Sequence, residues 1–248
     1  MRVLAIDTST LLGGVAIMDD LSGLIAEARL NVKSTHSERL MTAIDYVLKQ
    51  SGYRLSDMDF FAVAIGPGSF TGLRIGLSTV KGFSYATGKP IVSVPTLEAL
   101  AQNFPFCRYP VCTMLDARKK EVYVALFEWE GEGFIRLMPE MSVKVEEFLK
   151  SLRGDNHRKV VFTGDGAILY RDEISDCMSE SAIFASPEKM VTSPANVASI
   201  GIQKALRGEF SDPIRLVPFY IRRSEAELKQ VKKAEGKELR AKNKERKA

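Results

Sequence analysis

The chain has 248 residues, of which 45% are hydrophobic, and its 35 basic and 31 acidic side chains give a net charge of +4. Such a length and apolar content can bury a large core in one or two domains. No apolar run approaches the roughly 20 residues that span a bilayer, and Asp7 comes too early for a secretory signal. We therefore expect a cytoplasmic protein without membrane contact.

Strands and helices alternate through the first 105 residues. Three short strands at hairpin spacing come first, and a capping box from Thr35 to Glu38 then begins a helix that Gly52 ends. The predicted elements, in chain order, are strands 2–7, 13–19 and 24–31, the helix between 35 and 52, strand 60–65, helix 71–86, strand 90–94 and helix 95–100. Because strand 60–65 follows a helix, it is expected to join the sheet parallel to a neighbour.

The second half echoes the first, with two strands joined by the polar turn 116–121. Its predicted elements are strands 109–115, 122–129 and 134–138, helix 145–152, strand 159–163 and helix 194–207. This order indicates an α/β protein with two domains, 1–105 and 106–224, and a basic tail at 225–248. The sequence leaves open whether helix 194–207 packs on the second domain or back on the first.

The tail 225–248 carries the surplus of positive charge. It has 9 basic and 5 acidic side chains, whereas residues 1–224 hold 26 of each sign. Its larger apolar residues are only Leu228, Val231 and Leu239, so it is either a solvated helix or disordered. Basic segments bind phosphates by releasing counterions. The tail is therefore expected either to contact a nucleic acid or only to keep the protein in solution.

Four glycines lie within the eleven residues from Gly66 to Gly76, between a predicted strand and a helix. Glycine permits positive φ and lets another group pack against the backbone, so an anion or another helix is expected close to this turn. The spacing differs from G-x-G-x-x-G, and no Gly-Lys-Ser/Thr follows, so the phosphate signal is weak. Helix 71–86 also contains Gly72, Gly76 and Gly82, which favours a flat face that another helix approaches.

Small polar residues follow two of the predicted strands. They are Asp7, Thr8, Ser9 and Thr10 after the first strand, and Gly164, Asp165 and Gly166 after strand 159–163. An acidic residue beside hydroxyls and glycines can serve a phosphate and its magnesium, so together these residues resemble a degraded nucleotide cleft. The alternative is that Asp7 and its neighbours only satisfy backbone groups in a tight turn. Asp116, Arg118 and Glu121 likewise form either a polar site or a turn with solvated charges.

The chain offers no convincing catalytic or metal-binding group. Its two histidines, His36 and His157, are far apart in the sequence, and Ser69 lacks the G-x-S-x-G elbow of a hydrolase nucleophile. The three cysteines show no C-x-x-C spacing, which argues against a disulfide framework or a zinc site. No catalytic residue, metal or cofactor is therefore predicted.

Six blocks of the sequence form a recognisable combination. They are Asp7 to Thr10, His36 to Met41, Gly66 to Gly76, Pro95 to Leu100, Asp116 to Tyr123 and Pro218 to Glu225. Together these blocks resemble the bacterial TsaB family, also called YeaZ. The resemblance covers residues 1 to 226, and the glycine-rich block is its most specific part. The tail beyond is an extension that the resemblance does not explain.

The resemblance implies an α/β, actin-like fold of the ribonuclease-H-like (ASKHA) type, with two domains and mixed sheets flanked by helices. It implies a non-catalytic subunit that pairs with the related subunit TsaD. In this family TsaD carries the metal and the transferase site for N6-threonylcarbamoyladenosine in tRNA, beside the anticodon. The metal-binding histidine pair of TsaD would fall on the first helix, where this chain has only His36. The small ATPase TsaE would join the assembly. A homodimer stays open when TsaD is absent, and so does direct contact of tRNA with residues 229–248 of the basic tail.

Two helices supply the predicted partner interface. An apolar stripe on the first and a small-residue face on the second would form half of a four-helix bundle, with TsaD or with a second copy. The residues are Leu40, Met41, Ile44, Val47, Leu48, Gly72, Gly76, Val80 and Phe83. The alternative is that Leu40, Ile44 and Val47 cover the protein's own sheet. An autonomous actin-like ATPase or kinase that uses Asp7 and the turn 164–166 stays as the alternative function.

Overall fold

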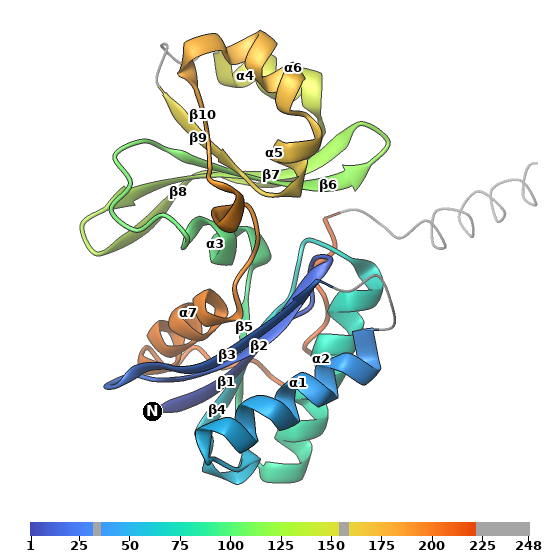
Figure 1. The fold of residues 1–248 in the computed structure, drawn as a ribbon, viewed down its shortest axis with the longest axis vertical. Coiled ribbons are helices and arrows are strands. Elements are labelled where there is room, and N and C mark those ends of the chain that lie inside the picture. Colours follow the sequence, from blue (N-terminus) through green and yellow to red (C-terminus); the bar gives the residue numbers. More distant parts are fainter. Residues whose placement is uncertain (32–35, 154–158, 222–248) are drawn as a thin grey trace, which may run out of the picture.

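The computed structural model describes residues 1–31, 36–153 and 159–221, which form two lobes stacked along the long axis of the molecule (Figure 1). The first lobe is built around a mixed sheet. The elements of the first half are β1 (Arg2–Asp7), β2 (Leu12–Asp19), β3 (Gly23–Asn31), α1 (His36–Ser51), β4 (Phe60–Ala64), α2 (Phe70–Thr87), β5 (Ile91–Val94) and α3 (Thr96–Ala101). A short 3-10 turn at Leu55–Asp57 precedes β4. The predicted cap Thr35 lies outside the described residues.

The second lobe is built around another mixed sheet. The elements of the second half are β6 (Val111–Arg118), β7 (Glu121–Glu130), β8 (Gly133–Lys144), α4 (Val145–Arg153), β9 (Val160–Thr163), α5 (Asp165–Leu169), α6 (Arg171–Met178), β10 (Ala182–Phe184) and α7 (Pro194–Leu206). The predicted elements are all present, with ends that differ by a few residues. The sequence did not predict α5, α6 and β10, and β8 is longer than expected.

Both sheets have the same strand order and the same mixture of directions. The first runs β3-β2-β1-β4-β5 and the second β8-β7-β6-β9-β10. β1 pairs antiparallel with β2 and parallel with β4, and β6 pairs in the same way with β7 and β9. The central strands β1 and β4 are nearly continuous apolar runs, typical of strands that are covered on both faces. The predicted mixed sheets and the parallel entry of strand 60–65 are thus confirmed.

The last helix of each half covers the sheet of the other half (Figure 1). α3 belongs by sequence to the first half, but its Leu97 packs with Leu115 and Phe127 of the second sheet. α7 packs in return against β1, β2, β4 and β5. A Cβ atom at Gly201 would lie 2.8 Å from the Cβ of Ala62, so α7 lies directly on the first sheet. The two lobes are therefore joined by an exchange of helices.

This exchange gives two predictions different outcomes. Helix 194–207 does return to the first sheet, as the sequence allowed. The helix predicted at 95–100 was placed in the domain 1–105, but its apolar side chains bury against the second sheet. A division near residue 105 separates the strands of the two sheets, but it does not separate the helices that cover them.

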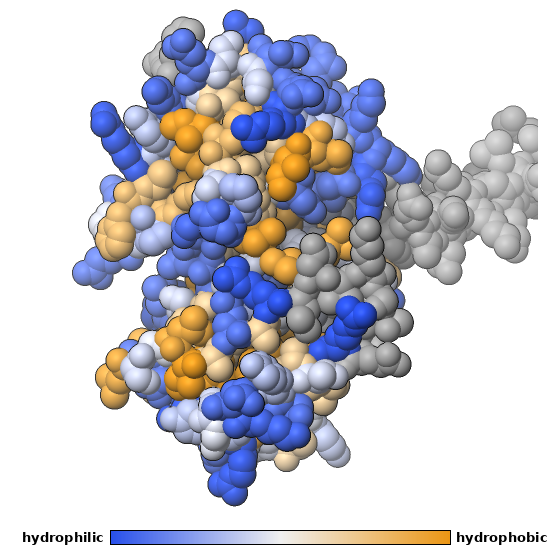
Figure 2. Space-filling model, in the orientation of Figure 1, coloured by the Kyte–Doolittle hydropathy of each residue, from blue (hydrophilic) through white to orange (hydrophobic). Residues whose placement is uncertain are grey.

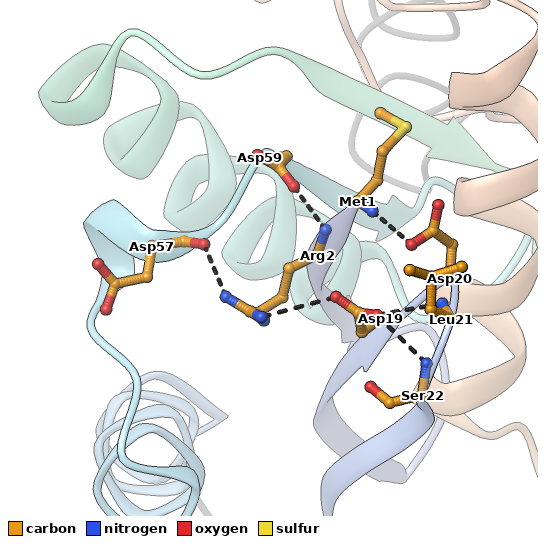
Figure 3. A network of polar contacts seen from close by, with 8 residues as sticks. All are labelled: Met1, Arg2, Asp19, Asp20, Leu21, Ser22, Asp57 and Asp59. Carbon is orange, nitrogen blue, oxygen red and sulfur yellow. Dashed lines mark hydrogen bonds and ion pairs between the residues drawn. The ribbon is translucent and has the colours of Figure 1, made fainter.

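Charged groups hold the start of β1 against its neighbours (Figure 3). The Met1 ammonium pairs with Asp20. The backbone N–H of Arg2 donates to Asp59 at 2.6 Å, and the Arg2 guanidinium lies 3.6 Å from the Asp19 carboxylate. These contacts connect β1 with the end of β2 and with the residue before β4, so they help to fix the register at the centre of the first sheet.

The substitution Leu97→Ala tests the coupling of the lobes. Leu97 is fully buried between α3 and the second sheet, and removing such a side chain costs about 2–5 kcal/mol. We expect the free energy of unfolding to fall by this amount in urea, in one transition seen both by Trp129 fluorescence and by far-UV circular dichroism.

The matched control is Leu21→Ala, at a side chain that is 93% exposed. It should change the free energy of unfolding by less than about 0.5 kcal/mol. Two separate transitions, or a Leu97→Ala variant as stable as this control, would contradict the coupling.

Candidate functional site

The glycine-rich turn from Gly66 to Gly76 closes around the end of β1. The N–H of Ser69 donates to the carbonyl of Ser9 at 2.7 Å, and the hydroxyl of Thr8 donates to the carbonyl of Gly72 at 2.7 Å. The Ser69 side chain caps α2 by accepting from the N–H of Gly72 at 3.2 Å. The start of α2 is therefore fastened to the turn between β1 and β2.

No side chain fits at the glycines of this turn. A Cβ atom at Gly72 would lie 1.9 Å from the carbonyl oxygen of Thr8, and one at Gly68 would lie 2.2 Å from that of Ser9. A Cβ atom at Gly76 would lie 2.4 Å from the Thr8 hydroxyl. The sequence predicts a close approach by an anion or another helix, but the approaching group is the end of the chain's own β1. This finding corrects the prediction.

The turn from Gly164 to Gly166 repeats this arrangement in the second lobe. Gly164 has a φ of 105°, and a Cβ atom there would lie 2.0 Å from the carbonyl oxygen of Met114 on β6. A Cβ atom at Gly166 would lie 3.1 Å from the same oxygen. Both glycine turns therefore pack against backbone that lies in, or directly after, the central strand of their own lobe.

Asp7 is fully buried where β1 ends. Its Oδ1 accepts hydrogen bonds from the N–H and the hydroxyl of Ser9, at 2.8 and 2.6 Å, as expected of a tight turn. Its Oδ2 has no hydrogen-bond partner among the described residues, although the Thr192 hydroxyl lies nearby. Burial raises the pKa of Asp7, and the nearby Ser9 and Thr192 groups oppose this rise only in part. A tight turn thus explains the contacts of Oδ1, but it leaves Oδ2 without a hydrogen bond from the described residues.

The predicted nucleotide residues are only partly brought together. Thr8 is buried against α2, and the hydroxyl of Thr10 donates to the carbonyl of Leu12 at 3.0 Å. Of the seven predicted residues, Ser9, Thr10 and Asp165 border the cleft between the lobes. The other four do not line it.

This cleft has a volume of about 590 Å³. The β1–β2 turn and the start of α2 form one wall, and the β6–β7 hairpin and α5 form the other. Leu11, Ile168 and Leu169 line it with more than half of each side chain exposed. Hydrophobic residues are also visible at the junction of the lobes in Figure 2. The sequence did not reveal these apolar walls, because such residues are normally read as core.

Two carboxylates lie together in the cleft. The N–H of Asp116 donates to Asp165 at 3.0 Å, and the N–H of Arg118 donates to Asp116 at 2.8 Å. Burial, and the nearby charge of Asp116, raise the pKa of Asp165. Glu121, which the sequence grouped with these residues, instead accepts a hydrogen bond from Ser142 at 3.3 Å. The cleft thus presents hydrogen-bond acceptors and one arginine between apolar walls.

Most of the predicted interface residues serve the protein's own core. The buried ones are Leu40, Ile44, Val47, Gly72, Gly76 and Val80. The other three are Met41, which is half exposed, and Leu48 and Phe83, which are partly buried. An apolar stripe marks the face that a helix turns to its sheet, and these six positions are buried within the first lobe. Their burial favours the alternative that they cover the protein's own sheet, and their assignment to a partner interface stays a prediction.

The outward face of α1 and α2 carries a different set of residues. The two helices lie side by side on one face of the first sheet (Figure 1). Tyr85 is 95% exposed and Met41 is 50% exposed, and Tyr46, Ser78 and Gly82 also face solvent. A Cβ atom at Gly82 would meet nothing within 4 Å. Contacts within the described part of the chain therefore do not require a glycine at this position.

The described parts of the chain contain neither a metal-binding cluster nor a helix that could span a membrane. There, no three His, Cys, Asp or Glu side chains are grouped so that they can hold a metal ion. His157 and the side chain of His36 lie outside these parts. None of the helices described here combines the length and apolarity needed to cross a membrane.

Comparisons with known proteins agree with one another. A family model described as "TsaD: tRNA N6-adenosine threonylcarbamoyltransferase" matches residues 24–230. The "tRNA threonylcarbamoyladenosine biosynthesis protein TsaB" of Bacillus subtilis is 31% identical over 93% of this chain and 98% of its own length. The protein of the same name from Escherichia coli is 33% identical over 62% of this chain and 69% of its own length.

Solved structures share the fold. YeaZ from Pseudomonas aeruginosa matches with a TM-score of 0.75 at 24% identity, covering 88% of this chain and 99% of that one. The ethanolamine utilization protein EutJ from Carboxydothermus hydrogenoformans matches with a TM-score of 0.51 at 12% identity, covering 80% and 89%. The predicted actin-like fold is confirmed. The chain belongs to the TsaB (YeaZ) family, whose curated relatives are named for the biosynthesis of tRNA threonylcarbamoyladenosine.

Proposed function

We propose that this chain is a non-catalytic subunit that binds a TsaD protein in the cytoplasm and is required for threonylcarbamoyl transfer to the tRNA adenosine next to the anticodon. The names of its relatives support the pathway. The packing of the two glycine turns supports the part of the proposal that says the chain is not catalytic. Because Thr8 and Met114 carbonyls fill the space against Gly72 and Gly164, a phosphate cannot approach these turns as it approaches a nucleotide-binding loop. TsaE is proposed as a further member of the assembly.

The proposed contact surface for TsaD is the outward face of α1 and α2. A glycine inside a helix costs about 1 kcal/mol relative to alanine, and no contact among the described residues compensates this cost at Gly82. A small residue beside exposed apolar side chains lets a helix of another subunit approach closely. Tyr85, Met41 and Tyr46 supply such side chains on the same two helices. The same face would serve a homodimer when TsaD is absent.

A second candidate function is an autonomous actin-like ATPase or kinase. Two observations favour it: the cleft between the lobes, and the buried Oδ2 of Asp7, which has no hydrogen-bond partner among the described residues. A bound cation or a reacting group is one way to satisfy such an oxygen. The glycine turns argue against this candidate, because the Thr8 and Met114 carbonyls already occupy the space that a phosphate would need.

The variants Gly82→Leu and Tyr85→Ala test the surface. We expect each to weaken co-purification with TsaD by about tenfold or more, since a lost central contact costs over 1 kcal/mol. Gly82→Leu should leave the free energy of unfolding unchanged or higher, because leucine favours helix. Leu206→Ala, at an exposed leucine on α7, is the matched control and should bind as the parent does. Undiminished binding by both variants would refute this surface.

Calorimetry with ATP and magnesium separates the two candidate functions. The isolated protein is expected to show no micromolar binding, because the backbone of β1 and β6 occupies both turns. Micromolar binding that disappears in Asp7→Asn would establish the second candidate instead.

Asp7→Asn also tests the electrostatic state of the buried carboxyl. A raised pKa means that the folded protein binds this proton more tightly than the unfolded chain does. The contribution of Asp7 to stability therefore falls as pH rises above about 4, the ordinary value for aspartate. We expect the difference in the free energy of unfolding, variant minus parent, to increase as pH rises toward neutral. Urea unfolding at several pH values measures this difference. The opposite trend would mean that the charged form of Asp7 has a favourable partner.

A further inference from the structure

The cleft between the lobes carries apolar side chains on both of its walls. Leu11, on the turn between β1 and β2, is 64% exposed, and Ile168 and Leu169 of α5 are 55% and 57% exposed on the opposite wall. A concave space of about 590 Å³ with such walls is typical of a small-molecule site, since these sites span roughly 300–1,000 Å³ and are lined mostly by apolar side chains. A ligand with an apolar body would remove these three side chains from water.

The charged groups of the cleft favour a cation. Its lining holds Asp116, Asp165 and Arg118, so it carries one net negative charge. One oxygen of each aspartate accepts a hydrogen bond from a backbone N–H. Burial raises the pKa of Asp165, and the nearby charge of Asp116 adds to this rise. A cation placed beside both carboxylates would relieve the repulsion between them.

Arg118 supplies this cation poorly. Its Nε lies 3.6 Å from Oδ2 of Asp116, which is too far for a hydrogen bond, and its side chain is 84% exposed. Ion pairs exposed to this degree contribute little to stability. An ammonium group that enters the cleft can therefore replace Arg118 beside Asp116 at little cost.

Hydrogen-bond donors that an anion would need are engaged on the first wall. The N–H of Ser69 donates to the carbonyl of Ser9, and the hydroxyl of Ser9 donates to the carboxylate at the end of β1. The hydroxyl of Thr10 donates to the carbonyl of Leu12. Of the residues that line the cleft, Arg118 alone is positively charged. A phosphate or a carboxylate would thus meet two acidic side chains with one arginine to balance them.

We infer that this cleft binds a small organic ammonium ion with an apolar body. The ammonium group donates hydrogen bonds to Asp116 and Asp165, and the body packs between Leu11 and the apolar side chains of α5. Hydrogen bonds between charged groups are about twice as strong as those between neutral ones, so the charge of the head group decides which ligand binds. The cleft shares no residue with the surface proposed for TsaD, so this site goes beyond the proposed function.

Three probes with the same apolar body test the head group: 4-phenylbutylamine, 4-phenylbutan-1-ol and 4-phenylbutanoate. The full chain, labelled at its leucine and isoleucine methyl groups, is titrated with each probe and followed by NMR. We expect the amine to bind about tenfold or more tightly than the alcohol, and the carboxylate to bind more weakly than either. The largest shifts should occur at Leu11, Ile168 and Leu169. Equal affinities for amine and alcohol, tighter binding of the carboxylate, or shifts confined to other methyl groups would overturn the inference.

Two substitutions should change the affinity for the amine in opposite directions. Asp116→Asn keeps an oxygen for the N–H of Arg118 but removes the charge, so we expect amine binding to weaken by about tenfold, to the level of the alcohol. Arg118→Gln removes the competing cation, so amine binding should strengthen by about two- to threefold. An anionic ligand would reverse the second sign. Weaker amine binding by Arg118→Gln therefore contradicts the assignment.

The matched control is Asp45→Asn, at an α1 side chain that is 60% exposed and lies outside the cleft. It should bind the amine within about twofold of the parent, because sites that share no partner act independently. Asp116→Asn binding as tightly as this control would refute the site. If Asp116→Asn lowers the melting temperature, Ile168→Ala replaces it and should weaken amine and alcohol alike by several-fold, since it removes part of the apolar wall. Unchanged binding of both probes by Ile168→Ala would refute the site as well.

Discussion

The contact between the end of β1 and the start of α2 is the constraint on which the first lobe depends. Backbone meets backbone there, with the Thr8 carbonyl so close to Gly72 that not even a methyl group fits between them. Hydrogen bonds from Ser69 and Thr8 fasten the same contact from both sides. The second lobe repeats it between Met114 and Gly164. The chain's own backbone thus fills the space beside both glycine turns, which supports protein contacts as its proposed task.

Much of the architecture was predictable because local patterns decide it. Alternating apolar runs and turns gave the strands, and the apolar stripe beginning at Leu40 gave α1. Patterns too short to be distinctive were missed: α5 has five residues, and α6 buries only Ile174 and Met178. The sequence also could not assign Leu97 to the second sheet, since the period of a helix shows that it has a buried face but not which sheet covers that face.

The candidate site was harder to predict, for a related reason. A run of glycines indicates that another group packs closely against the backbone. The sequence does not show whether this group belongs to a ligand, a partner or the chain itself. In the structure Gly72 and Gly76 meet the chain itself, whereas Gly82 on the same helix meets nothing. The three-dimensional packing separates these cases. For this reason the interface is proposed on the outer face of α2 and not on its inner face. The wall residues Leu11 and Ile168 carry no sequence signal that distinguishes a cleft from a core.

The exchange of α3 and α7 has a consequence for how the protein is made. The apolar face formed by Val3, Phe60 and Val92 is complete only when α7 covers it, and α7 is among the last described segments to leave the ribosome. During synthesis the first sheet must therefore expose that face until nearly the whole polypeptide has emerged. Nascent chains arrested before residue 194 would carry an uncovered sheet, which makes them natural clients of chaperones that recognise apolar surfaces.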